Sequence, residues 1–172
     1  MEVRNKIWEE IKQAKSNAIC IRRYNSLQRQ LNCLYNVFIA TAATIGTIST
    51  RFNMELSIYA LVSIAFVSLV KSIFPQILQP EQELCNLDAL MDYYNSFANK
   101  LEYLFYQFDE DKITEEEVVE KLFNMKYEEC NKQSQMNKLI RFIPWYIQND
   151  VDKEIKIYLD EVYYDKYEHD EK

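Results

Sequence analysis

Two apolar segments, residues 34–50 and 56–74, interrupt an otherwise mixed pattern of polar and apolar positions. The first contains no charged residue, and the second contains only Lys71, close to its end. Helices of this length rise about 25–28 Å, close to the thickness of the hydrocarbon core of a bilayer. The pattern therefore predicts a transmembrane hairpin with a polar turn at residues 51–55. A buried hairpin in a soluble helical protein is the alternative, because the first segment is short and carries several hydroxyl groups.

The N-terminal stretch, residues 1–33, has the spacing of one long amphipathic helix. Apolar or small side chains recur every three or four residues, as in a helix with one buried stripe. They are Ile7, Ile11, Ala14, Ala18, Ile21, Tyr24, Leu27 and Leu31. Because no glycine or proline precedes residue 34, we expect the helix to continue into the first apolar segment. Packing on the C-terminal part of the same chain and an intermolecular coiled coil both fit this stripe.

A second stripe of the same helix carries small and weakly polar side chains through the first apolar segment. Its members are Asn36, Ala40, Ala43, Thr47 and Thr50, preceded at the same spacing by Arg22, Asn25 and Arg29. Such residues suit either a close helix–helix contact or the wall of a hydrated pore, and the sequence leaves both open. Two helices cannot enclose a water path, so a pore requires a homo-oligomer. Threonine hydroxyls in this segment are expected to bond to the carbonyl one turn earlier, which lowers their cost in lipid.

Residues 75–172 are predicted to form a cytoplasmic helical domain. Pro75 and Pro80 end the second apolar segment, because proline cannot continue a helix in its interior. A broad apolar face from Leu84 to Phe108 then predicts a long helix that packs against other helices.

The remainder of this domain is expected to hold two further helices. Thr114 and Glu117 have the spacing of a capping box, which predicts the start of one helix. Pro144 interrupts the apolar cluster at residues 142–146. We assign this cluster either to a membrane interface or to the underside of the bundle. The last helix is expected from about Val151. The predicted organisation is all-α, with an amphipathic helix at 1–33, a hairpin at 34–74 and a helical domain at 75–172.

Charge is segregated along the chain, although its mean hydropathy of −0.36 is that of a soluble protein. Residues 1–34 hold seven basic and three acidic side chains, whereas residues 81–172 hold eleven basic and twenty-three acidic ones. By the positive-inside rule, a basic flank before the hairpin predicts that both chain ends lie in the cytoplasm. The first apolar run follows a long charged helix, so we expect the hairpin itself, rather than a secretory signal peptide, to direct the chain to a membrane.

Residue types needed for catalysis or metal binding are scarce. The chain has one glycine, Gly46, and one histidine, His169, which argues against phosphate-binding loops and histidine-based metal sites. Its four cysteines lack CxxC spacing and fit reduced thiols used as small apolar fillers. Acidic pairs such as Asp88 and Asp92 have no nucleophile or base to complete a catalytic group. We therefore expect no enzyme activity, no metal and no cofactor.

The order of these features resembles the SLATT family of bacterial proteins. The likeness rests on the basic helix with Ile-Arg-Arg-Tyr-Asn at residues 21–25 ahead of a two-helix membrane hairpin, on the return into a helix over residues 84–104, and on the Thr-Glu-Glu-Glu helix that contains Tyr127. The resemblance implies an effector in the bacterial inner (plasma) membrane, of a class proposed to form pores. Such effectors belong to antiviral conflict systems, beside enzymes that make nucleotide signals.

The sequence and the resemblance together favour an oligomeric membrane effector that arrests a phage-infected cell when a nucleotide-derived signal or a partner opens or closes it. A cyclic or linear oligonucleotide made by a partner nucleotidyltransferase is the signal that the resemblance implies. An anionic signal needs basic side chains within a field that is otherwise acidic, and aromatic faces for stacking. The candidates are Arg22, Arg23, Arg29, Lys132, Lys138 and Arg141, with Tyr93, Tyr94 or Trp145 near them. A non-conducting anchor that recruits a soluble partner through the acidic C-terminal helices is the alternative.

Overall fold

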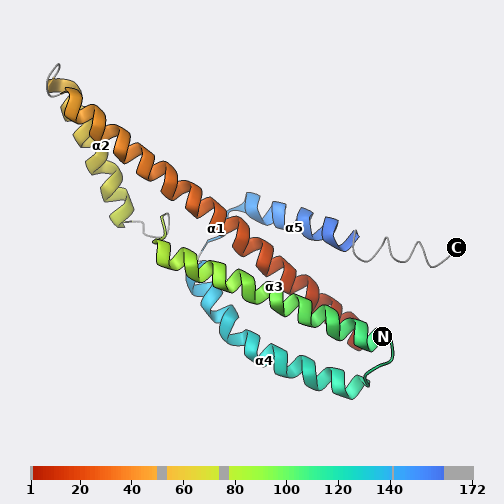
Figure 1. The fold of residues 1–172 in the computed structure, drawn as a ribbon. Helices are drawn as coiled ribbons and strands as arrows, with labels where there is room; N and C mark the ends of the chain where they lie inside the picture. Colours follow the sequence, from red (N-terminus) through yellow and green to blue (C-terminus); the bar gives the residue numbers. More distant parts are fainter. Residues whose placement is uncertain (1, 50–53, 74–77, 141, 161–172) are drawn as a thin grey trace. The chain divides into compact units, whose positions relative to one another are not determined.

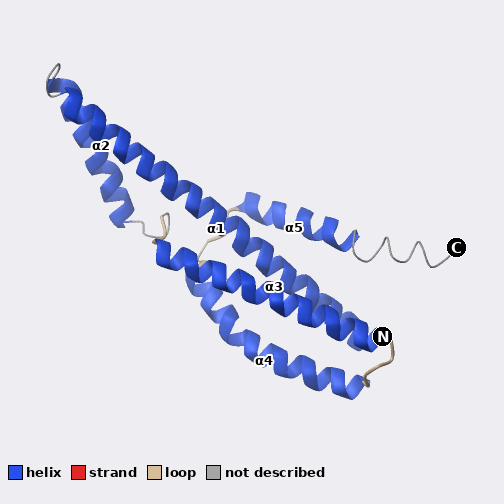
Figure 2. Cartoon of the chain, in the orientation of Figure 1, coloured by secondary structure: helices blue, strands red, loops and turns tan. Residues whose placement is uncertain are grey.

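The computed structural model describes residues 2–49, 54–73, 78–140 and 142–160. The elements of regular structure in these ranges are all helices (Figures 1 and 2). They are α1 (Glu2–Ser49), α2 (Met54–Ile73), α3 (Glu81–Asp109), α4 (Glu115–Leu139) and α5 (Trp145–Leu159). The prediction of an all-α chain is therefore confirmed.

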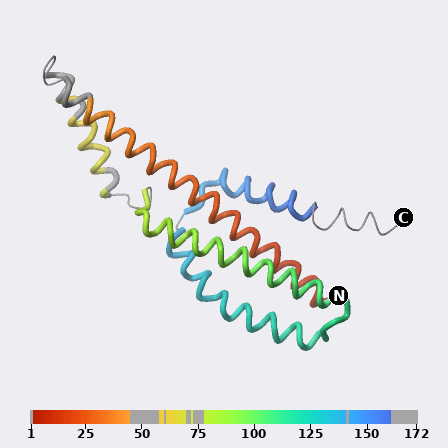
Figure 3. The backbone as a smooth tube through the Cα atoms, in the orientation of Figure 1, coloured from red at the N-terminus to blue at the C-terminus, as the bar shows by residue number. Residues whose placement is uncertain are grey.

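The first helix, α1, is uninterrupted over 48 residues. Figure 3 traces its path from the N-terminal end of the chain. α1 contains no proline. Each amide in its interior can therefore donate to the carbonyl four residues earlier, and the helix is not interrupted. This confirms that the amphipathic stretch continues into the first apolar segment. α2 already begins at Met54, two residues before the predicted start at residue 56, and the predicted turn residues 51–53 lie outside the description.

The chain forms two compact units, and α1 contributes to both of them. The first unit consists of Met1–Tyr24 and Cys85–Lys172, and the second of Asn25–Leu84. The predicted division of the sequence at residues 33 and 74 stays a prediction.

The predicted hairpin is present as a helical element, formed by the second half of α1 and by α2. Among the residues described, however, no helix combines the length and the apolar composition needed to cross a membrane. The transmembrane part of the fold prediction is therefore not confirmed.

The core of the first unit lies between α1, α3 and α4, which run alongside one another in Figure 1. Apolar side chains of α1 that recur every three or four residues meet those of α3 and α4. The buried cluster consists of Ile7, Ile11, Ala14, Phe97, Ala98, Leu101, Leu104, Phe105, Val118 and Leu122. Of the two uses considered for the N-terminal stripe, packing on the C-terminal part of the same chain is the one observed. Ile7 and Ile11 are fully buried there, which leaves no apolar seam for a coiled coil at these positions.

The last helix begins earlier than predicted. α5 starts at Trp145 rather than near Val151, with Pro144 in the capping position before it. Proline suits this place because the first amides of a helix have no intrahelical acceptor. α5 packs through Ile147, Val151 and Ile155, which recur every four residues and are all buried.

The apolar cluster at residues 142–146 is only partly buried. The side chains of Phe142 and Trp145 are about three-quarters exposed, and that of Tyr146 is also exposed. Only Ile147, directly after the cluster, turns into the core. The assignment of residues 142–146 to the underside of the bundle is therefore wrong for these three aromatic residues.

The predicted capping box at the start of α4 is confirmed. The Thr114 hydroxyl accepts a hydrogen bond from the Glu117 amide at 3.3 Å, and the Glu117 carboxylate accepts one from the Thr114 amide at 2.9 Å. The bond from the Thr114 amide, together with one from the Thr114 hydroxyl to the same carboxylate at 3.1 Å, lowers the pKa of Glu117. Replacing Thr114 by alanine is expected to lower the free energy of unfolding by about 1 kcal/mol, because the Glu117 amide loses its hydroxyl acceptor. Thr114→Ser is the control in denaturant titrations, and equal stability of both variants would contradict the capping role.

Polar side chains fasten the base of the second unit. Asn32 donates from Nδ2 to the carbonyl of Gln79 at 2.8 Å, and the amide of Gln79 donates to Oε1 of Gln28 at 3.3 Å. Asn25 donates to the carbonyl of Leu84 at 3.3 Å. The two bonds at Gln79 satisfy backbone groups between α2 and α3, and the bond at Leu84 is an additional contact to a carbonyl in the first turn of α3. Specific polar contacts therefore join α1 to the segment around Gln79 and to the start of α3.

Candidate functional site

The apolar side chains of α2 are exposed on most sides of the helix. Relative exposures lie between 53 and 66 % for Ile58, Leu61, Val62, Phe66 and Leu69. Among the α2 side chains that the structure describes, only Ile64 and Val67 are half-buried. A helix that is apolar all round is normally covered by protein or lipid. The residues that the structure describes leave these α2 side chains largely uncovered.

The stripe predicted to line a pore lies beside the hairpin seam, not in it. Asn36, Ala40 and Ala43 of α1 are exposed, whereas Ala42 is buried and Ile39 is half-buried. The stripe is thus not a helix–helix contact within one chain at these three positions. The side chain of Thr47 and the whole of Thr50 lie outside the description.

The threonine hydroxyls of this segment bond back to their own helix as predicted. Thr41 donates to the carbonyl of Val37, and Thr44 to that of Ala40, both at 2.8 Å. Ser63 of α2 does the same with the carbonyl of Tyr59 at 2.9 Å. These donors therefore require no water or protein partner outside the helix.

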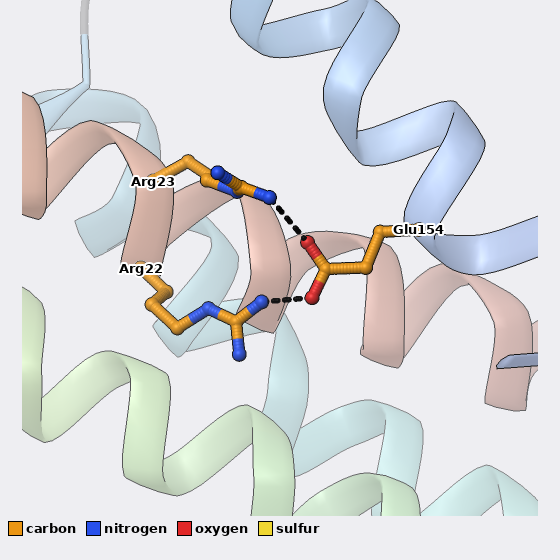
Figure 4. Close-up of polar contacts among 3 residues, drawn as sticks. All are labelled: Arg22, Arg23 and Glu154. Carbon is orange, nitrogen blue, oxygen red and sulfur yellow. Dashed lines mark hydrogen bonds and ion pairs between the residues drawn. The ribbon is translucent and has the colours of Figure 1, made fainter. Parts of the chain in front are cut away.

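Two of the predicted ligand-binding arginines are engaged by a carboxylate of the same chain. Glu154 of α5 accepts from Arg22 with one oxygen and from Arg23, at 3.2 Å, with the other (Figure 4). Burial of Glu154 opposes its ionisation, but the two guanidinium groups outweigh this effect and lower its pKa. These contacts fasten α5 to α1. An anionic ligand would have to compete with the Glu154 carboxylate for Arg22 and Arg23.

A second polar contact fastens α5 one turn further along. Tyr158 donates a hydrogen bond to Glu102 of α3, which also pairs with the ammonium group of Lys15 at 3.2 Å. The same ammonium group lies 4.8 Å from the centre of the Tyr158 ring. α5 is thus held by polar contacts at two successive turns as well as by its apolar stripe.

Neutralising Glu154 is expected to loosen α5. Each exposed ion pair contributes about 0.2–1 kcal/mol, so Glu154→Gln should raise the amide hydrogen exchange of α5 without unfolding the unit. Because the folded-state pKa is lowered, the stabilisation is complete above the usual value of 4.5 and is lost as the pH falls below it. Asp152→Asn, the same charge change on the exposed side of α5, is the control. Equal exchange in both variants at neutral pH would contradict the fastening role.

Arg29 belongs to the second unit and pairs with Glu81 at 2.9 Å. The six predicted ligand residues are therefore not brought together into one site. Arg22 and Arg23 face α5, and Arg141 lies outside the description.

Lys132 and Lys138 do lie together, along a groove of about 460 Å³ between α3 and α4. Carboxamides and apolar side chains complete its lining, which consists of Asn86, Ala89, Leu90, Gln135 and Leu139. The ammonium group of Lys132 lies 5.6 Å from the centre of the Tyr93 ring. Tyr94, also proposed for stacking, is fully buried and cannot stack on a ligand.

A buried polar cluster behind Tyr93 was not anticipated from the sequence. Glu129 of α4 is almost fully buried and pairs at 3.2 Å with Lys126, which also contacts Glu10 of α1 at 2.7 Å. Burial first, and then the charge of Glu129, raises the pKa of both Tyr93 and Tyr94. Among the residues described, neither tyrosine hydroxyl has a partner with hydrogen-bond geometry.

The one sequence signal for this cluster is Asn17. It interrupts the apolar stripe of α1 and is buried there. Its side chain lies close enough to the Tyr94 hydroxyl to oppose part of the rise in the pKa of Tyr94. A polar residue on an apolar stripe is thus a sign of a buried polar contact.

Among the residues described, no group of three or more histidine, cysteine or acidic side chains is placed to hold a metal ion. Comparison of the chain with protein families, with curated proteins and with solved structures finds no match.

Proposed function

We propose that the protein is an oligomeric membrane effector whose hairpin is embedded in a bilayer and conducts ions. In this proposal the chain ends lie in the cytoplasm, and a nucleotide-derived signal or a partner gates the assembly during antiphage defence. The resemblance to the SLATT family supports this biology. The physical support comes from the hairpin.

The observation that carries the proposal is the exposed apolar surface of α2. Large apolar side chains on most sides of one helix are costly in water, at about 25 cal/mol for each Å² left exposed. Lipid or neighbouring copies of the hairpin would remove this cost. In the sequence, residues 56–74 hold a single charge, Lys71, whose long stem can reach a lipid headgroup.

The exposed stripe of α1 supports a conducting assembly rather than a simple anchor. The Asn36 carboxamide is costly in lipid, and its side chain is exposed together with the small side chains of Ala40 and Ala43, which permit close helix–helix approach. Symmetric association of several hairpins would place these stripes around a common axis. Small and weakly polar side chains would then face water.

α1 also offers a direct mechanical link for gating. It carries the buried stripe of the first unit and continues without a break into the hairpin. A change in how α3, α4 and α5 hold its first half therefore acts on the same continuous helix that bears the stripe. Gating then amounts to a shift between two packings of the first unit.

Currents across planar bilayers test the proposal. The purified protein is expected to give stepwise conductance, and Asn36→Leu should lower it about tenfold by placing an apolar side chain on the pore wall. Val37→Leu is the matched control, because Val37 is the neighbouring exposed residue and lies outside the stripe. Silence of the wild-type protein, or equal conductance of both variants, would contradict a pore lined by this stripe.

A non-conducting anchor is the second candidate, and a different surface favours it. Val119, Phe123 and Tyr127 recur every four residues on α4 and are 47, 69 and 75 % exposed. Such an apolar stripe suits the docking of a partner helix. An anchor predicts silent bilayers and loss of the partner on Phe123→Ala, whereas the pore predicts unchanged conductance in that variant.

A further inference from the structure

We propose that the groove between α3 and α4 binds a ligand with two or more phosphate groups through Lys132 and Lys138. This inference rests on the proposed function only for its role as the gating site, because binding itself requires no conductance. It assigns the signal to one place in the fold and to one chemical class.

The charged lining of the groove is entirely basic among the residues described. Lys132 and Lys138 supply its charges, and within the described part of the chain no ion pair joins either ammonium group to a carboxylate. By contrast, the hollow between α1 and α5 is lined by both acidic and basic residues. In a chain with a net charge of −7, a groove with only positive charges is selective for anions.

The remaining lining suits a phosphorylated ligand. Asn86 and Gln135 carry amide donors that can bond to phosphate oxygens, as lysine does. Leu90 and Leu139 add apolar surface on which an uncharged part of the ligand can lie. The volume of about 460 Å³ is within the range of small-molecule sites.

The spacing of the two lysines favours more than one phosphate group. They are six residues apart on α4, which places their Cα atoms about 9 Å apart along the helix axis. Their flexible stems can converge from both ends of the groove on neighbouring phosphates. A single phosphate would be shared by both ammonium groups, whereas a diphosphate can pair with each of them.

The groove is linked to α1 by aromatic contacts. Lys132 lies over the ring of Tyr93, and Tyr93 packs edge-to-face on Tyr94 with ring centres 5.5 Å apart. Tyr94 is fully buried beside Asn17 of α1. An anion that draws Lys132 away from Tyr93 therefore changes a packed chain of contacts that ends on the helix bearing the hairpin.

Titration calorimetry of the full chain in mild detergent tests the site, with pyrophosphate, ADP and adenosine as probes. We expect pyrophosphate and ADP to bind and adenosine not to bind. Lys132→Ala/Lys138→Ala should weaken binding by about tenfold or more, because both charge-assisted contacts are lost. The matched control is Lys100→Ala/Lys153→Ala, which removes the same charge from exposed lysines outside the groove and should change affinity by less than about twofold.

Each result bears on the inference. Tighter binding of ADP than of pyrophosphate supports a nucleotide as the ligand, and equal binding supports a polyphosphate recognised by its phosphates alone. Absence of binding by both, equal loss in the two double variants, or adenosine binding as tight as that of ADP would overturn the site. Binding by a protein that gives silent bilayers would retain the site and reject the pore.

Discussion

Replacing Val62 and Phe66 of α2 by lysine is expected to prevent the hairpin from entering lipid. Both side chains are more than 60 % exposed, so neither change creates a cavity in the chain. Each lysine near the centre of a bilayer costs about 2.5–3.5 kcal/mol, which lowers partitioning by about 70- to 400-fold per residue. Flotation with liposomes made from bacterial lipids measures the bound fraction.

The matched control for this experiment lies on α4. Phe123→Lys/Tyr127→Lys introduces the same charge on apolar side chains that are at least as exposed. The proposal predicts that this variant floats with the liposomes like the wild-type protein. Equal loss of flotation in both double variants would mean that the hairpin is not the element that enters lipid.

The largest expected effect on stability is that of Leu101→Ala in α3. Leu101 is fully buried in the cluster formed by α1, α3 and α4. Truncation leaves a cavity among three helices that meet there, and such changes cost about 2–5 kcal/mol. Denaturant unfolding followed by circular dichroism should show a lower midpoint with an unchanged slope.

Tyr103→Ala provides the comparison on the same helix. Tyr103 is 65 % exposed, so its truncation should change the free energy of unfolding by no more than about 0.5 kcal/mol. If both variants lost the same stability, the first unit would not depend on the buried cluster.

The helices could be predicted from the sequence because each depends on local signals. The continuity of α1 follows from the absence of proline, and the start of α4 from the Thr114–Glu117 capping box. The apolar face predicted from Leu84 to Phe108 matches the buried residues of α3 as far as Phe105, and Phe108 is half-buried. The start of α5 was misplaced because Pro144 was taken to break a helix, whereas it precedes one.

The pairing of charges could not be predicted, because it depends on which helices meet. Arg22 and Glu154 are 132 residues apart, and no periodicity relates them. The same holds for Lys126 and Glu10, which meet across α4 and α1. Sequence reasoning thus found basic residues but not their partners, and it grouped six of them where the structure brings two lysines together.

The side of α1 used for packing was also beyond the sequence. The stripes that contain Ala42 and Ala43 are both composed of residues suited to a helix–helix seam. Only the position of α2 within the second unit decides that Ala42 is buried and Ala43 is exposed. Which of two adjacent stripes is buried depends on the tertiary contact with α2 and cannot be predicted from helical spacing alone.

The depth of α2 in a bilayer tests the central claim most directly. An environment-sensitive fluorophore is attached to cysteine in Phe66→Cys and, separately, in Phe123→Cys, with the four native cysteines replaced by serine. The proposal predicts that liposomes shift the emission at position 66 to the blue and that lipid-borne quenchers reach it, while the label at position 123 stays in water. Emission typical of water at both positions would contradict a lipid-embedded hairpin.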